Sequence, residues 1–445
     1  MGTESEVTRR DFLKAATGAT ALSSVTFLTR PERVFGANDR VRVAICGLRG
    51  RGKDHLDGFS RLPNVEIAAL CDVDEAVLNK RRAEVASGTP TFVDVRRLLE
   101  QPSIDAISIA TPNHWHALMA IWACQAGKDV YLEKPCSHNM WEGRQLVRAA
   151  EKYRRIVQHG TQSRSAGAMT EAIRHLHGDT FGDIYMARAL CFKWRDTIGR
   201  KPAEPVPAGV DYDLWTGPAP LKPFTRNRFH YNWHWIWDTG NGDLGNQAIH
   251  QIDDARWGLG VALPNRVSAM GGHFMFDDDQ ETPNTLSCVF EFDRPNGRRK
   301  MIEVEVRHWI TNNEAGIHAD SHNTIGTVFY GSNGYLAAGN EDDFSYESWI
   351  GRDRTPGPRG HSGDDHFANF VDCVRSRKTE DLAAPIREGH ISCALVHLAN
   401  ASYRVGRTLQ VDPESEQVIG DEEATRLLSG RDRGYRSPFV IPDDV

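Results

Sequence analysis

Residues 41–52 of this chain read Val41-Arg42-Val43-Ala44-Ile45-Cys46-Gly47-Leu48-Arg49-Gly50-Arg51-Gly52. The β-branched and small residues from Val41 to Cys46 predict a buried parallel strand. The glycines that follow allow a tight turn, and helical spacing resumes at Lys53. A strand, turn and helix of this kind aim backbone N–H groups and the positive end of the helix dipole at one point, which suits a pyrophosphate.

A second apolar run, Glu66 to Cys71, follows the turn and ends at Asp72. An acidic side chain there can accept hydrogen bonds from ribose hydroxyls and repel a 2′-phosphate. The glycine turn alone is weak evidence, because tight turns need glycine for their backbone geometry and because Arg49 stands where the second glycine of G-x-G-x-x-G is expected. Together with the strand and Asp72, the turn predicts a dinucleotide site that prefers NAD to NADP.

The segments after Asp72 indicate the fold class. Up to His159, strand-like runs alternate with helix-like runs, which predicts a doubly wound parallel sheet. Beyond Gly160 the strand-like runs show alternating patterning, which predicts an α+β domain with a large, mostly antiparallel sheet. We therefore expect an α/β fold with four parts: a signal region at 1–37, a dinucleotide-binding domain at 38–160, a substrate and oligomerisation domain at 161–410, and a polar C-terminal tail at 411–445.

The N-terminal region has the design of a twin-arginine export signal. Arg9 and Arg10 precede a mildly apolar stretch, residues 15–28, that is rich in Ala, Thr and Ser. The alternative is a membrane anchor, but this stretch is too short and too polar to span a bilayer comfortably. We expect cleavage between residues 28 and 37, export to the periplasm, and no membrane span in the mature protein.

The chain has 445 residues and a net charge of −7. Its length suffices for two domains with a substantial core. With no basic stripe in the sequence, the negative charge argues against a nucleic-acid partner. The eight cysteines show no metal-ligand spacing, and several stand in apolar strand-like runs, where cysteine is usually a small core residue. We predict neither a disulfide framework nor a metal site.

Lys134 stands at a predicted strand end, between Glu133 and Pro135. Ligands bind at the carboxyl ends of the strands in a doubly wound sheet, so this lysine can donate a hydrogen bond to a reacting hydroxyl or carbonyl oxygen. The alternative is a solvated surface lysine, which is the more common case for any one lysine.

Residues 240–254 hold a second group of polar residues. If this stretch is a helix, Asn246, His250 and Asp253 lie on one face at i, i+4 and i+7. A histidine beside a carboxylate can act as a general acid or base, with the carboxylate fixing its orientation. The alternative is a hydrogen-bonded structural histidine. A His and Asp pair can also hold a metal, but no third ligand follows at a suitable spacing.

Residues 230–238 are dense in aromatic side chains, among them Tyr231 and Trp235. Tyr and Trp rings can stack on sugar faces, or they can pack a domain junction. Residues 202–223 form a long proline-rich loop of the kind that often serves as a lid or an assembly arm. Further polar candidates near predicted strand ends are Gln162, Arg164, Lys193 and Arg195.

These motifs together resemble those of the Gfo/Idh/MocA oxidoreductase family, which includes glucose-fructose oxidoreductase and inositol dehydrogenase. The likeness covers most of the chain from Val41 to about Leu409, and it rests on the glycine turn, Asp72, the His250 helix, Glu133-Lys134-Pro135 and Thr111-Pro112-Asn113-His114-Trp115-His116. It implies a Rossmann domain, a C-terminal mixed-sheet domain that also mediates oligomerisation, and a nicotinamide cofactor between them. It also implies that Lys134 and His250 act on a sugar or polyol hydroxyl. Family members commonly carry an aspartate four residues before that histidine, where this chain has Asn246.

The residues and the resemblance together give three sets of candidates. We expect catalysis to involve Lys134, His250, Asn246 and Asp253. We expect NAD to be bound by Gly47, Arg49, Gly50, Arg51, Gly52, Asp72, Thr111, Pro112, Asn113, His116, Glu133, Lys134 and Gln162. We expect the substrate to contact Lys134, Arg164, Lys193, Tyr231, Trp235, Asn246 and His250.

The leading hypothesis is an NAD-dependent oxidoreductase that acts on a sugar or glycoside hydroxyl, with His250 as base, Lys134 orienting the oxygen, and a tightly bound cofactor recycled internally. The first alternative is a redox-neutral NAD-dependent glycosidase or lyase, in which transient oxidation acidifies a neighbouring C–H. The second is a non-catalytic sugar- or NAD-sensing protein, since fold does not fix function. The presence of both Lys134 and His250 argues against that second alternative. The expected partners are a small-molecule carbohydrate and further copies of the chain, in a homodimer or homotetramer.

Overall fold

The computed structural model describes residues 40–295, 297–314, 316–317, 323–339, 344–363, 365–430 and 434–445. The predicted signal region, 1–37, lies outside the described residues, so the twin-arginine signal stays a prediction. Within the described ranges, the helices are all too short or too polar to cross a membrane.

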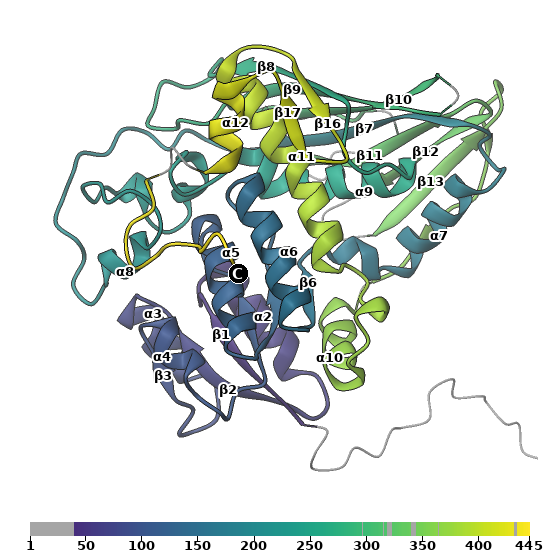
Figure 1. The fold of residues 1–445 in the computed structure, drawn as a ribbon. Helices are drawn as coiled ribbons and strands as arrows, with labels where there is room; N and C mark the ends of the chain where they lie inside the picture. Colours follow the sequence, from purple (N-terminus) through teal and green to yellow (C-terminus); the bar gives the residue numbers. More distant parts are fainter. Residues whose placement is uncertain are drawn as a thin grey trace, which may run out of the picture. The chain divides into compact units, whose positions relative to one another are not determined.

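The first domain is built on a parallel sheet, as predicted, and the sheet has six strands (Figure 1). Its strands lie in the order β3-β2-β1-β4-β5-β6. They are β1 (Val41–Cys46), β2 (Val65–Cys71), β3 (Thr91–Phe92), β4 (Ala106–Ile109), β5 (Asp129–Leu132) and β6 (Val157–His159). Every residue of β4 and β5 is buried, which is the pattern of central strands with helices on both faces.

The helices that connect these strands are α2 (Gly50–Ser60), α3 (Glu75–Arg82), α4 (Val95–Leu99), α5 (Asn113–Gln125) and α6 (Met140–Lys152). Asp74 caps the N-terminus of α3, and Asn139 caps that of α6, each through its side chain. By contrast, α2 begins after Arg49, which provides no side-chain cap. The first N–H groups of α2 are therefore left for another acceptor.

The second domain is built on an eleven-stranded sheet, with the strand order β14-β13-β12-β11-β7-β10-β9-β8-β16-β17 and with β15 paired to β13. Only β7 and β10 pair in parallel within the described residues, so the sheet is mostly antiparallel, as predicted. The strands are β7 (Ile184–Lys193), β8 (Arg266–Gly272), β9 (Thr285–Asp293), β10 (Arg299–His308), β11 (Asn323–Gly331), β12 (Gly334–Gly339), β13 (Ser345–Ile350), β14 (Thr355–Pro356), β15 (Gly360–His361), β16 (Leu409–Asp412) and β17 (Gln417–Ile419).

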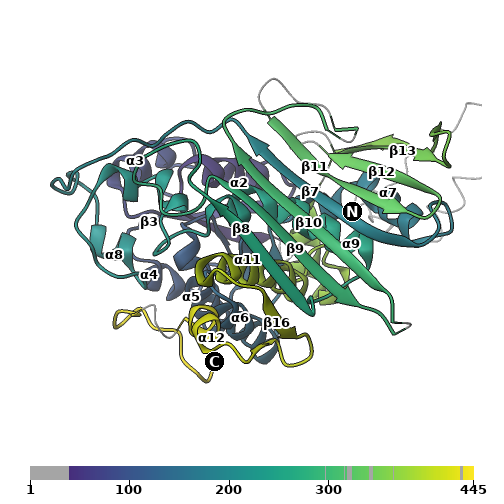
Figure 2. The ribbon, with the colours of Figure 1, turned by 90° about the horizontal axis from the view of Figure 1, so that it is seen from above.

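Helices cover one face of this second sheet. They are α7 (Gly167–His177), α9 (Ile249–Leu259) and α11 (Ile386–Val405), which lie beneath the sheet in Figure 1. Figure 2 looks onto the opposite face, where no helix of the described residues lies over β7 to β11. On β8, Val267 is buried toward the helices and Met270 is 82% exposed on the open face. Phe274, just beyond β8, is 74% exposed.

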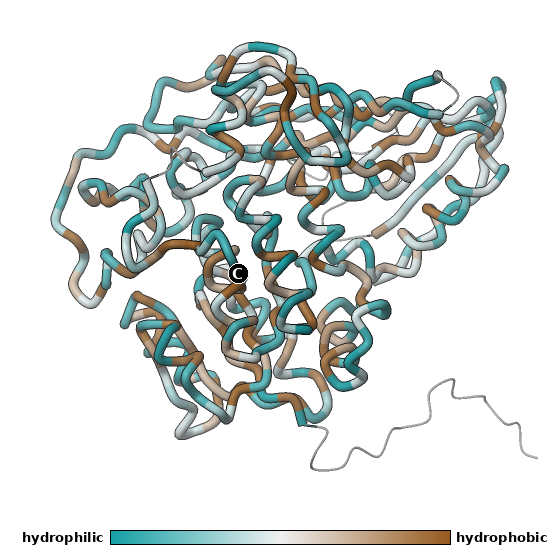
Figure 3. Tube along the Cα trace, viewed as in Figure 1, coloured by the Kyte–Doolittle hydropathy of each residue, from teal (hydrophilic) through white to brown (hydrophobic). Residues whose placement is uncertain are grey.

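The core lies around α5, α11 and the two sheets. In Figure 3 apolar segments, in brown, gather where α5 and the first sheet lie, and the outer loops are mainly polar. Helix α11 is buried over most of its length and packs on α6, α9, β6 and β8. A helix that is apolar on most of its sides is expected in such a central position. It therefore joins the packing of the two domains.

Two later segments complete the packing of the first sheet. In α10 (His366–Ser376), Phe370 is buried in one cluster with Val43 of β1 and Phe59 of α2. Near the end of the chain, Phe439 packs edge-on against Trp115 of α5, with ring centroids 5.4 Å apart. Parts of the chain that come late in the sequence thus belong to the core of the first domain.

The C-terminal segment differs from the polar surface tail that the sequence predicts. It forms β16, β17 and α12 (Glu422–Ser429), and beyond them Phe439, Ile441 and Val445 are buried. Lys152 of α6 donates a hydrogen bond from Nζ to the carbonyl oxygen of Val445 at 2.5 Å. The apolar residues of 411–445 are too widely spaced to show a period, which is why the sequence pattern does not reveal them.

Candidate active site

Two cavities meet at Lys134. The turn cavity, of about 410 Å³, lies between the glycine turn, the ends of β2 and β4, and the aromatic run 230–238. The helix cavity, of about 350 Å³, lies beside α9 and the second sheet. The residues that line both are Arg51, Glu133, Lys134, Tyr231 and Asn246. A molecule in one cavity can therefore meet a molecule in the other at this junction.

Close backbone contacts shape the glycine turn. Gly47 has a φ of +81°, and a Cβ atom there would lie 2.7 Å from the carbonyl oxygen of Ala110. A Cβ at Gly52 would lie 1.8 Å from the carbonyl oxygen of Gly47. A Cβ at Gly50 would meet nothing within 4 Å, and Gly50 lines the turn cavity. Gly52 lines neither cavity, so its lack of a side chain serves the packing of the turn. The backbone that is open to a ligand is that of Gly50.

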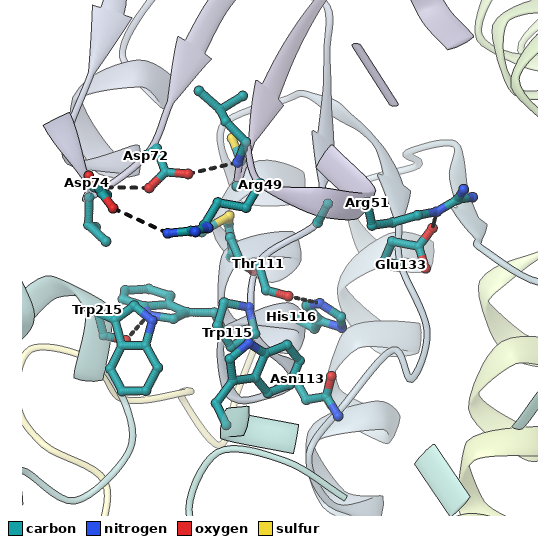
Figure 4. A pocket seen from close by; sticks show the side chains of 18 of the residues that line it. Arg49, Arg51, Asp72, Asp74, Thr111, Asn113, Trp115, His116, Glu133 and Trp215 are labelled. Atoms are coloured by element: carbon teal, nitrogen blue, oxygen red, sulfur yellow. Dashed lines mark hydrogen bonds and ion pairs between the residues drawn. The ribbon is translucent and has the colours of Figure 1, made fainter. Parts of the chain in front are cut away.

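Asp72 fastens the turn to the end of β2 (Figure 4). Its Oδ2 accepts the N–H of Leu48 at 2.7 Å, and its Oδ1 accepts the N–H of Asp74 at 3.0 Å. Burial raises the pKa of Asp72, although these two N–H groups favour the ionised form. Each carboxylate oxygen keeps a further lone pair, so Asp72 can still accept hydrogen bonds from the hydroxyls of a ribose.

Arg49 and His230 close the edge of the turn cavity beside Asp74. Nη1 of Arg49 and Nε2 of His230 each lie 3.6 Å from Oδ2 of Asp74. The guanidinium of Arg49 also contacts the ring of His230. Because His230 belongs to the aromatic run, a segment of the second domain reaches across this cavity to the end of β2.

Thr111, Pro112, Asn113 and His116 line the turn cavity at the end of β4. His116 places Nε2 at 2.7 Å from the carbonyl oxygen of Thr111 and Nδ1 at 2.6 Å from that of Pro135, so it joins two loops. The hydroxyl oxygen of Thr111 is buried and has no hydrogen-bond partner in the described part of the chain. A buried hydroxyl in this state is suited to a ligand.

Glu133 holds Arg51 and His55 at the junction. Its Oε1 accepts from Nε of Arg51 at 2.6 Å (Figure 4). The same oxygen lies 2.9 Å from Nε2 of His55. Burial opposes the ionisation of Glu133, but Arg51 and His55 hold its pKa well below the ordinary value. The site therefore keeps a carboxylate next to Lys134.

Lys134 reaches from the first domain to the second. Its Nζ donates a hydrogen bond to the carbonyl oxygen of Asn246 at 2.5 Å and lies 3.5 Å from Oδ1 of the same residue. Burial, followed by the charges of Arg51 and Lys193, lowers the pKa of Lys134, although Glu133 opposes that change. The predicted placement of Lys134 at the mouth of the first sheet is what the structure shows.

The predicted helical face of Asn246, His250 and Asp253 does not form as expected. Residues Leu244–Ala248 are a π-helix, and the α-helix α9 begins only at Ile249. A π-turn has a wider hydrogen-bond spacing than an α-turn, so the rotation between Asn246 and the residues of α9 differs from that in a regular α-helix. Asn246 and His250 still line the helix cavity, but Asp253 lies in neither cavity.

Asp253 pairs instead with Arg164. Nε of Arg164 donates to Oδ2 of Asp253 at 2.7 Å, and the second guanidinium nitrogen donates to Oδ1 at 2.9 Å. Ser392 donates to the same carboxylate at 2.6 Å. Arg164, a predicted substrate contact, also lies in neither cavity. Their bidentate ion pair is buried between α9 and the segment after β6, which makes it a structural contact.

His250 faces the helix cavity. It has no hydrogen-bond partner among the described residues, and no carboxylate orients it. Burial, followed by the positive charge of Lys134, lowers the pKa of His250 to about 3. The imidazole is therefore neutral near pH 7 and can accept a proton.

Sequence reasoning missed Asp243 and His308. The buried carboxylate of Asp243 accepts two hydrogen bonds from Arg195, at 2.5 and 2.8 Å, and one from Nδ2 of Asn246 at 3.1 Å. His308 lies 2.9 Å from the same carboxylate. Burial opposes ionisation, but Arg195 and His308 hold the pKa of Asp243 well below its usual value. These residues form the wall behind Asn246.

The remaining predicted substrate contacts divide between the cavities and the core. Lys193 and Gln162 line the helix cavity, so Gln162 lies away from the turn where a cofactor contact was expected. Lys193 donates from Nζ to Oε1 of Gln247 at 3.0 Å. Tyr231 lines both cavities. Trp235 lies in neither, because it is buried under the guanidinium of Arg195 at 4.9 Å.

Residues 209–217, which include α8 (Tyr212–Thr216), form a strap beside the turn cavity. The strap is tied to the first domain by hydrogen bonds from Glu75 N–H to the Gly209 carbonyl (2.9 Å) and from Asp211 N–H to the Val73 carbonyl (3.0 Å). Leu214 and Trp215, both within the strap, line the turn cavity. From the C-terminal segment, Arg436 donates to the carboxylate of Asp213 at 2.7 Å. The strap is thus fastened on both sides.

All eight cysteines lie in the described residues, where they are buried and form no disulfide bond. Among those residues, one group could hold a metal ion: Cys136, His159 and Cys393, whose donor atoms all lie within 4.8 Å of one another. These positions are far apart in sequence, so spacing could not show the group. The prediction of no metal site stays a prediction.

The sequence matches two family models. Residues 41–161 match an oxidoreductase family model with an NAD-binding Rossmann fold, and residues 183–270 and 357–440 match an oxidoreductase family C-terminal alpha/beta domain. With the sheets described above, these matches define the class of protein: a Rossmann domain followed by an α+β domain of oxidoreductase type. The chain belongs to the Gfo/Idh/MocA oxidoreductase family, as its motifs indicated.

Curated relatives carry the name of glycosyl hydrolase family 109. The protein of that family from Shewanella baltica is 34% identical over 169 residues, which cover 32% of this chain and 37% of that protein. The match therefore spans little more than a third of the relative's length. A second such protein, from Saccharopolyspora erythraea, is 25% identical over 366 residues and covers 75% of this chain and 74% of that protein.

Solved structures share the fold. The WlbA dehydrogenase of Bordetella pertussis, in complex with NADH and UDP-GlcNAcA, has a TM-score of 0.62 at 20% identity, covering 84% of this chain and 99% of that one. The aldose-aldose oxidoreductase of Caulobacter crescentus, complexed with glycerol, has a TM-score of 0.63 at 16% identity, covering 84% and 100%.

The residues of the turn cavity fit NAD, the cofactor that the matched family model names. The open backbone at Gly50 and the uncapped start of α2 suit the pyrophosphate. Asp72 can accept hydrogen bonds from the ribose hydroxyls, and the buried hydroxyl of Thr111 can form a hydrogen bond with the cofactor.

Proposed function

We propose that this protein is an NAD-dependent oxidoreductase acting on a hydroxyl of a sugar or glycoside, with a cofactor that stays bound and is recycled. The observation that carries the proposal is the position of Lys134 at the junction of two cavities. One cavity fits NAD. The other is lined by polar side chains suited to carbohydrate hydroxyls, including Lys193, Gln247 and His250.

In this proposal, bound NAD supplies the hydride acceptor, and the protein handles the oxygen and the proton. Lys134 donates a hydrogen bond to the reacting hydroxyl, and its positive charge favours the developing alkoxide. His250 is neutral and has no hydrogen-bond partner among the described residues, so it accepts the hydroxyl proton. The same two groups serve the reverse reaction, in which a carbonyl is reduced.

The strap supports a retained cofactor. Leu214 and Trp215 of the strap line the turn cavity, and hydrogen bonds hold the strap to the first domain and to the C-terminal segment. We expect a dinucleotide in this cavity to leave faster when these bonds open. The electrons taken from one substrate must then return to the same molecule or to a second substrate, because the cofactor does not exchange with solution.

A second candidate function is redox-neutral cleavage of a glycoside through a keto intermediate. The relatives named glycosyl hydrolase family 109 favour it, the second of them over 75% of this chain. A ketone acidifies the neighbouring C–H, the glycosidic oxygen leaves by elimination, and the returning hydride completes the cycle. Lys134 and His250 keep the same roles in both functions.

The test uses the purified full chain without added NAD or acceptor. It is given a panel of glycosides, each deuterated at one ring carbon in turn, and products are analysed by mass. We expect repeated turnover with a primary isotope effect at one carbon. Turnover that requires added NAD and yields equal NADH would instead show a dehydrogenase with an exchanging cofactor. No turnover of any glycoside would reject the proposed function.

We also propose that copies of the chain assemble through the open face of the second sheet. The exposed Met270 and Phe274 support this, because large exposed apolar residues on a sheet face favour association. Light scattering should report a dimer or tetramer, and Met270→Glu combined with Phe274→Glu should shift it toward the monomer. An unchanged oligomer would exclude this face.

Export to the periplasm by the twin-arginine route is a further proposal, supported by Arg9 and Arg10 before the apolar stretch. Fractionation of cells that express the full chain should find the protein in the periplasm. Replacing both arginines by lysine should retain it in the cytoplasm. Equal distribution of the two versions would contradict the proposal.

A further inference from the structure

His234 is a second imidazole that lines a cavity beside Lys134, on a different element from His250. It belongs to the 3₁₀ turn Asn232–Trp235 in the aromatic run, and it lines the turn cavity together with Lys134 and Asn246. His250 lines the helix cavity together with the same two residues. The two histidines thus approach Lys134 from different cavities.

The ring of His234 is held in one orientation. Its Nδ1 donates a hydrogen bond to the carbonyl oxygen of Tyr231 at 2.5 Å, and the ring stacks on Trp233 with centroids 3.6 Å apart and planes at 21°. A Cβ at Gly240 would lie 2.2 Å from the carbonyl oxygen of His234, so the backbone is tightly packed as well. Because a carbonyl oxygen only accepts, the hydrogen is on Nδ1 and Nε2 carries the lone pair.

Nε2 of His234 has no hydrogen-bond partner among the described residues. Burial, followed by the charges of Lys134 and Arg195, lowers the pKa of His234 to about 3, although the hydrogen bond to Tyr231 opposes this. The ring is therefore neutral near pH 7. An oriented neutral imidazole whose lone pair is unused can act as a general base.

We propose that His234 is a catalytic acid/base residue distinct from His250, and that it moves the proton of the carbon next to a transient ketone. This rests on the proposed function, in its glycoside-cleaving form. The hydroxyl proton and the carbon-bound proton stand at different places on a sugar ring. Two bases on different elements match these two proton transfers, whereas His250 alone faces only one of the cavities.

The step balances without a further reactant. The ring carbon next to the ketone gives its proton to Nε2 of His234, and the C–H electron pair becomes a carbon–carbon double bond. On the next carbon, the bond to the glycosidic oxygen breaks, and its electron pair leaves with that oxygen. The imidazolium then gives its proton to the leaving oxygen, which departs as an alcohol. His234 returns to its neutral form, and water can add to the enone.

The test compares the full-length wild type with His234→Asn, which keeps an N–H able to reach the Tyr231 carbonyl but lacks Nε2. His234→Gln is the second variant, and His177→Asn, which changes an exposed histidine of α7, is the control. Circular dichroism and the NAD content per chain show that each variant folds. The probe is a glycoside that the wild type turns over, supplied in deuterium oxide.

Two readouts separate the steps. Reduction of the bound cofactor in a single turnover reports oxidation, and deuterium in the recovered glycoside reports exchange at the carbon next to the ketone. We expect His234→Asn and His234→Gln to keep cofactor reduction within about threefold and to lose exchange and cleavage on the order of 10²-fold or more. His177→Asn should match the wild type.

Exchange and cleavage at wild-type rates in both His234 variants would overturn the proposal. Loss of cofactor reduction together with cleavage would also overturn it, because His234 would then act in the oxidation. If the wild type reduces its cofactor but neither exchanges nor cleaves, the oxidoreductase stands and the role of His234 falls. If the wild type never reduces its cofactor, the proposed function itself fails.

Discussion

Lys134 of the first domain donates a hydrogen bond from Nζ to the backbone carbonyl oxygen of Asn246 in the second domain, at 2.5 Å. That oxygen belongs to the π-helix Leu244–Ala248, and short π-helical segments frequently occur at functional sites. The bond holds the ammonium group at the junction of the two cavities. A substrate hydroxyl that binds there meets a donor that is already oriented.

Replacing Lys134 with methionine tests this donor. Methionine keeps the length and apolar stem of the side chain but removes the charge and the N–H groups. We expect kcat to fall on the order of 10²–10⁴-fold while NAD content stays at the wild-type level, because the loss falls on the transition state. Turnover assays and cofactor release after denaturation measure both. A variant that turns over normally would show that Lys134 only joins the domains.

The pH profile tests His250. Its pKa of about 3 lies well below that of an ordinary histidine. Nearly all of the His250 side chains are therefore already neutral at pH 5, and raising the pH further adds little neutral base. We therefore expect kcat/KM to show no fall between about pH 7 and pH 5 from this group. His250→Asn should lower kcat on the order of 10²–10⁴-fold and keep the cofactor.

An acid limb in kcat/KM with a midpoint near that of free histidine, absent in His250→Asn, would contradict the low pKa. The stability of the protein must be measured over the same range, so that unfolding is not mistaken for titration of the base.

Asp72→Ala tests cofactor selection. The carboxylate lines the turn cavity at the end of β2, where its charge disfavours a 2′-phosphate. Removing the carboxylate should lower the ratio of NAD affinity to NADP affinity, and titration of cofactor-free protein with each cofactor measures that ratio. The variant also loses the acceptor for the N–H groups of Leu48 and Asp74, so some affinity for both cofactors should be lost. An unchanged ratio would show that Asp72 serves only the turn.

Arg436→Gln tests the strap. The guanidinium donates to the side chain and the backbone carbonyl of Asp213 and to the carbonyl oxygens of Gly217 and Ala219. Without these bonds the strap should open more often, and NAD should leave faster. Mixing the protein with excess labelled NAD and following the uptake of label over time measures the rate at which bound NAD exchanges. Arg387→Gln, which removes an arginine far from the strap in sequence, is the control, and equal rates in all three proteins would reject the strap as a barrier.

Asp254→Asn tests the pH dependence of stability. Burial, followed by the charge of Asp253, raises the pKa of Asp254 to about 7 in the folded state, although Ser163 donates to it at 2.7 Å. Because the folded pKa is raised, the stabilising contribution is complete below the unfolded pKa and is lost as pH rises toward 7. The loss is of the order of 4 kcal/mol at most.

Asp254→Asn should therefore raise the free energy of unfolding at pH 8 relative to the wild type, and change it little at pH 4. Denaturant unfolding at both values measures this, with the exposed Asp179→Asn as control. A variant that is less stable at pH 8 would show that the ionised carboxylate is favoured in the folded protein.

Much of the fold follows from local sequence. Local sequence explains the apolar run of β1, the glycines after it and Asp72 at the end of β2. The structure places each of them where the sequence pattern predicts. The alternation of strands and helices gives the first sheet, and the change to alternating patterning gives the second. Lys134 could be placed as well, because strand ends in such a sheet share one edge.

The rest depends on contacts between residues far apart in sequence. Asp243 meets Arg195 and His308 only because β7 and β10 pair beside the π-helix. The π-helix itself changes the spacing between Asn246 and Asp253, and no period in the sequence shows it. Trp235 is of the residue type that often stacks on sugars, but its ring is buried beneath the guanidinium of Arg195, which places it in the core.

The last residues of the chain pack on α5 and α6, and Arg436 fastens the strap. A ribosome makes residues 434–445 only after every strand of the first sheet has been made. The dinucleotide-binding domain therefore cannot reach its final packing until these residues have been made, and a fragment that ends at residue 160 would expose the surfaces that Phe439 and Phe370 cover. Cofactor loading thus has a natural time window, which opens when the first sheet forms and closes when residues 434–445 dock.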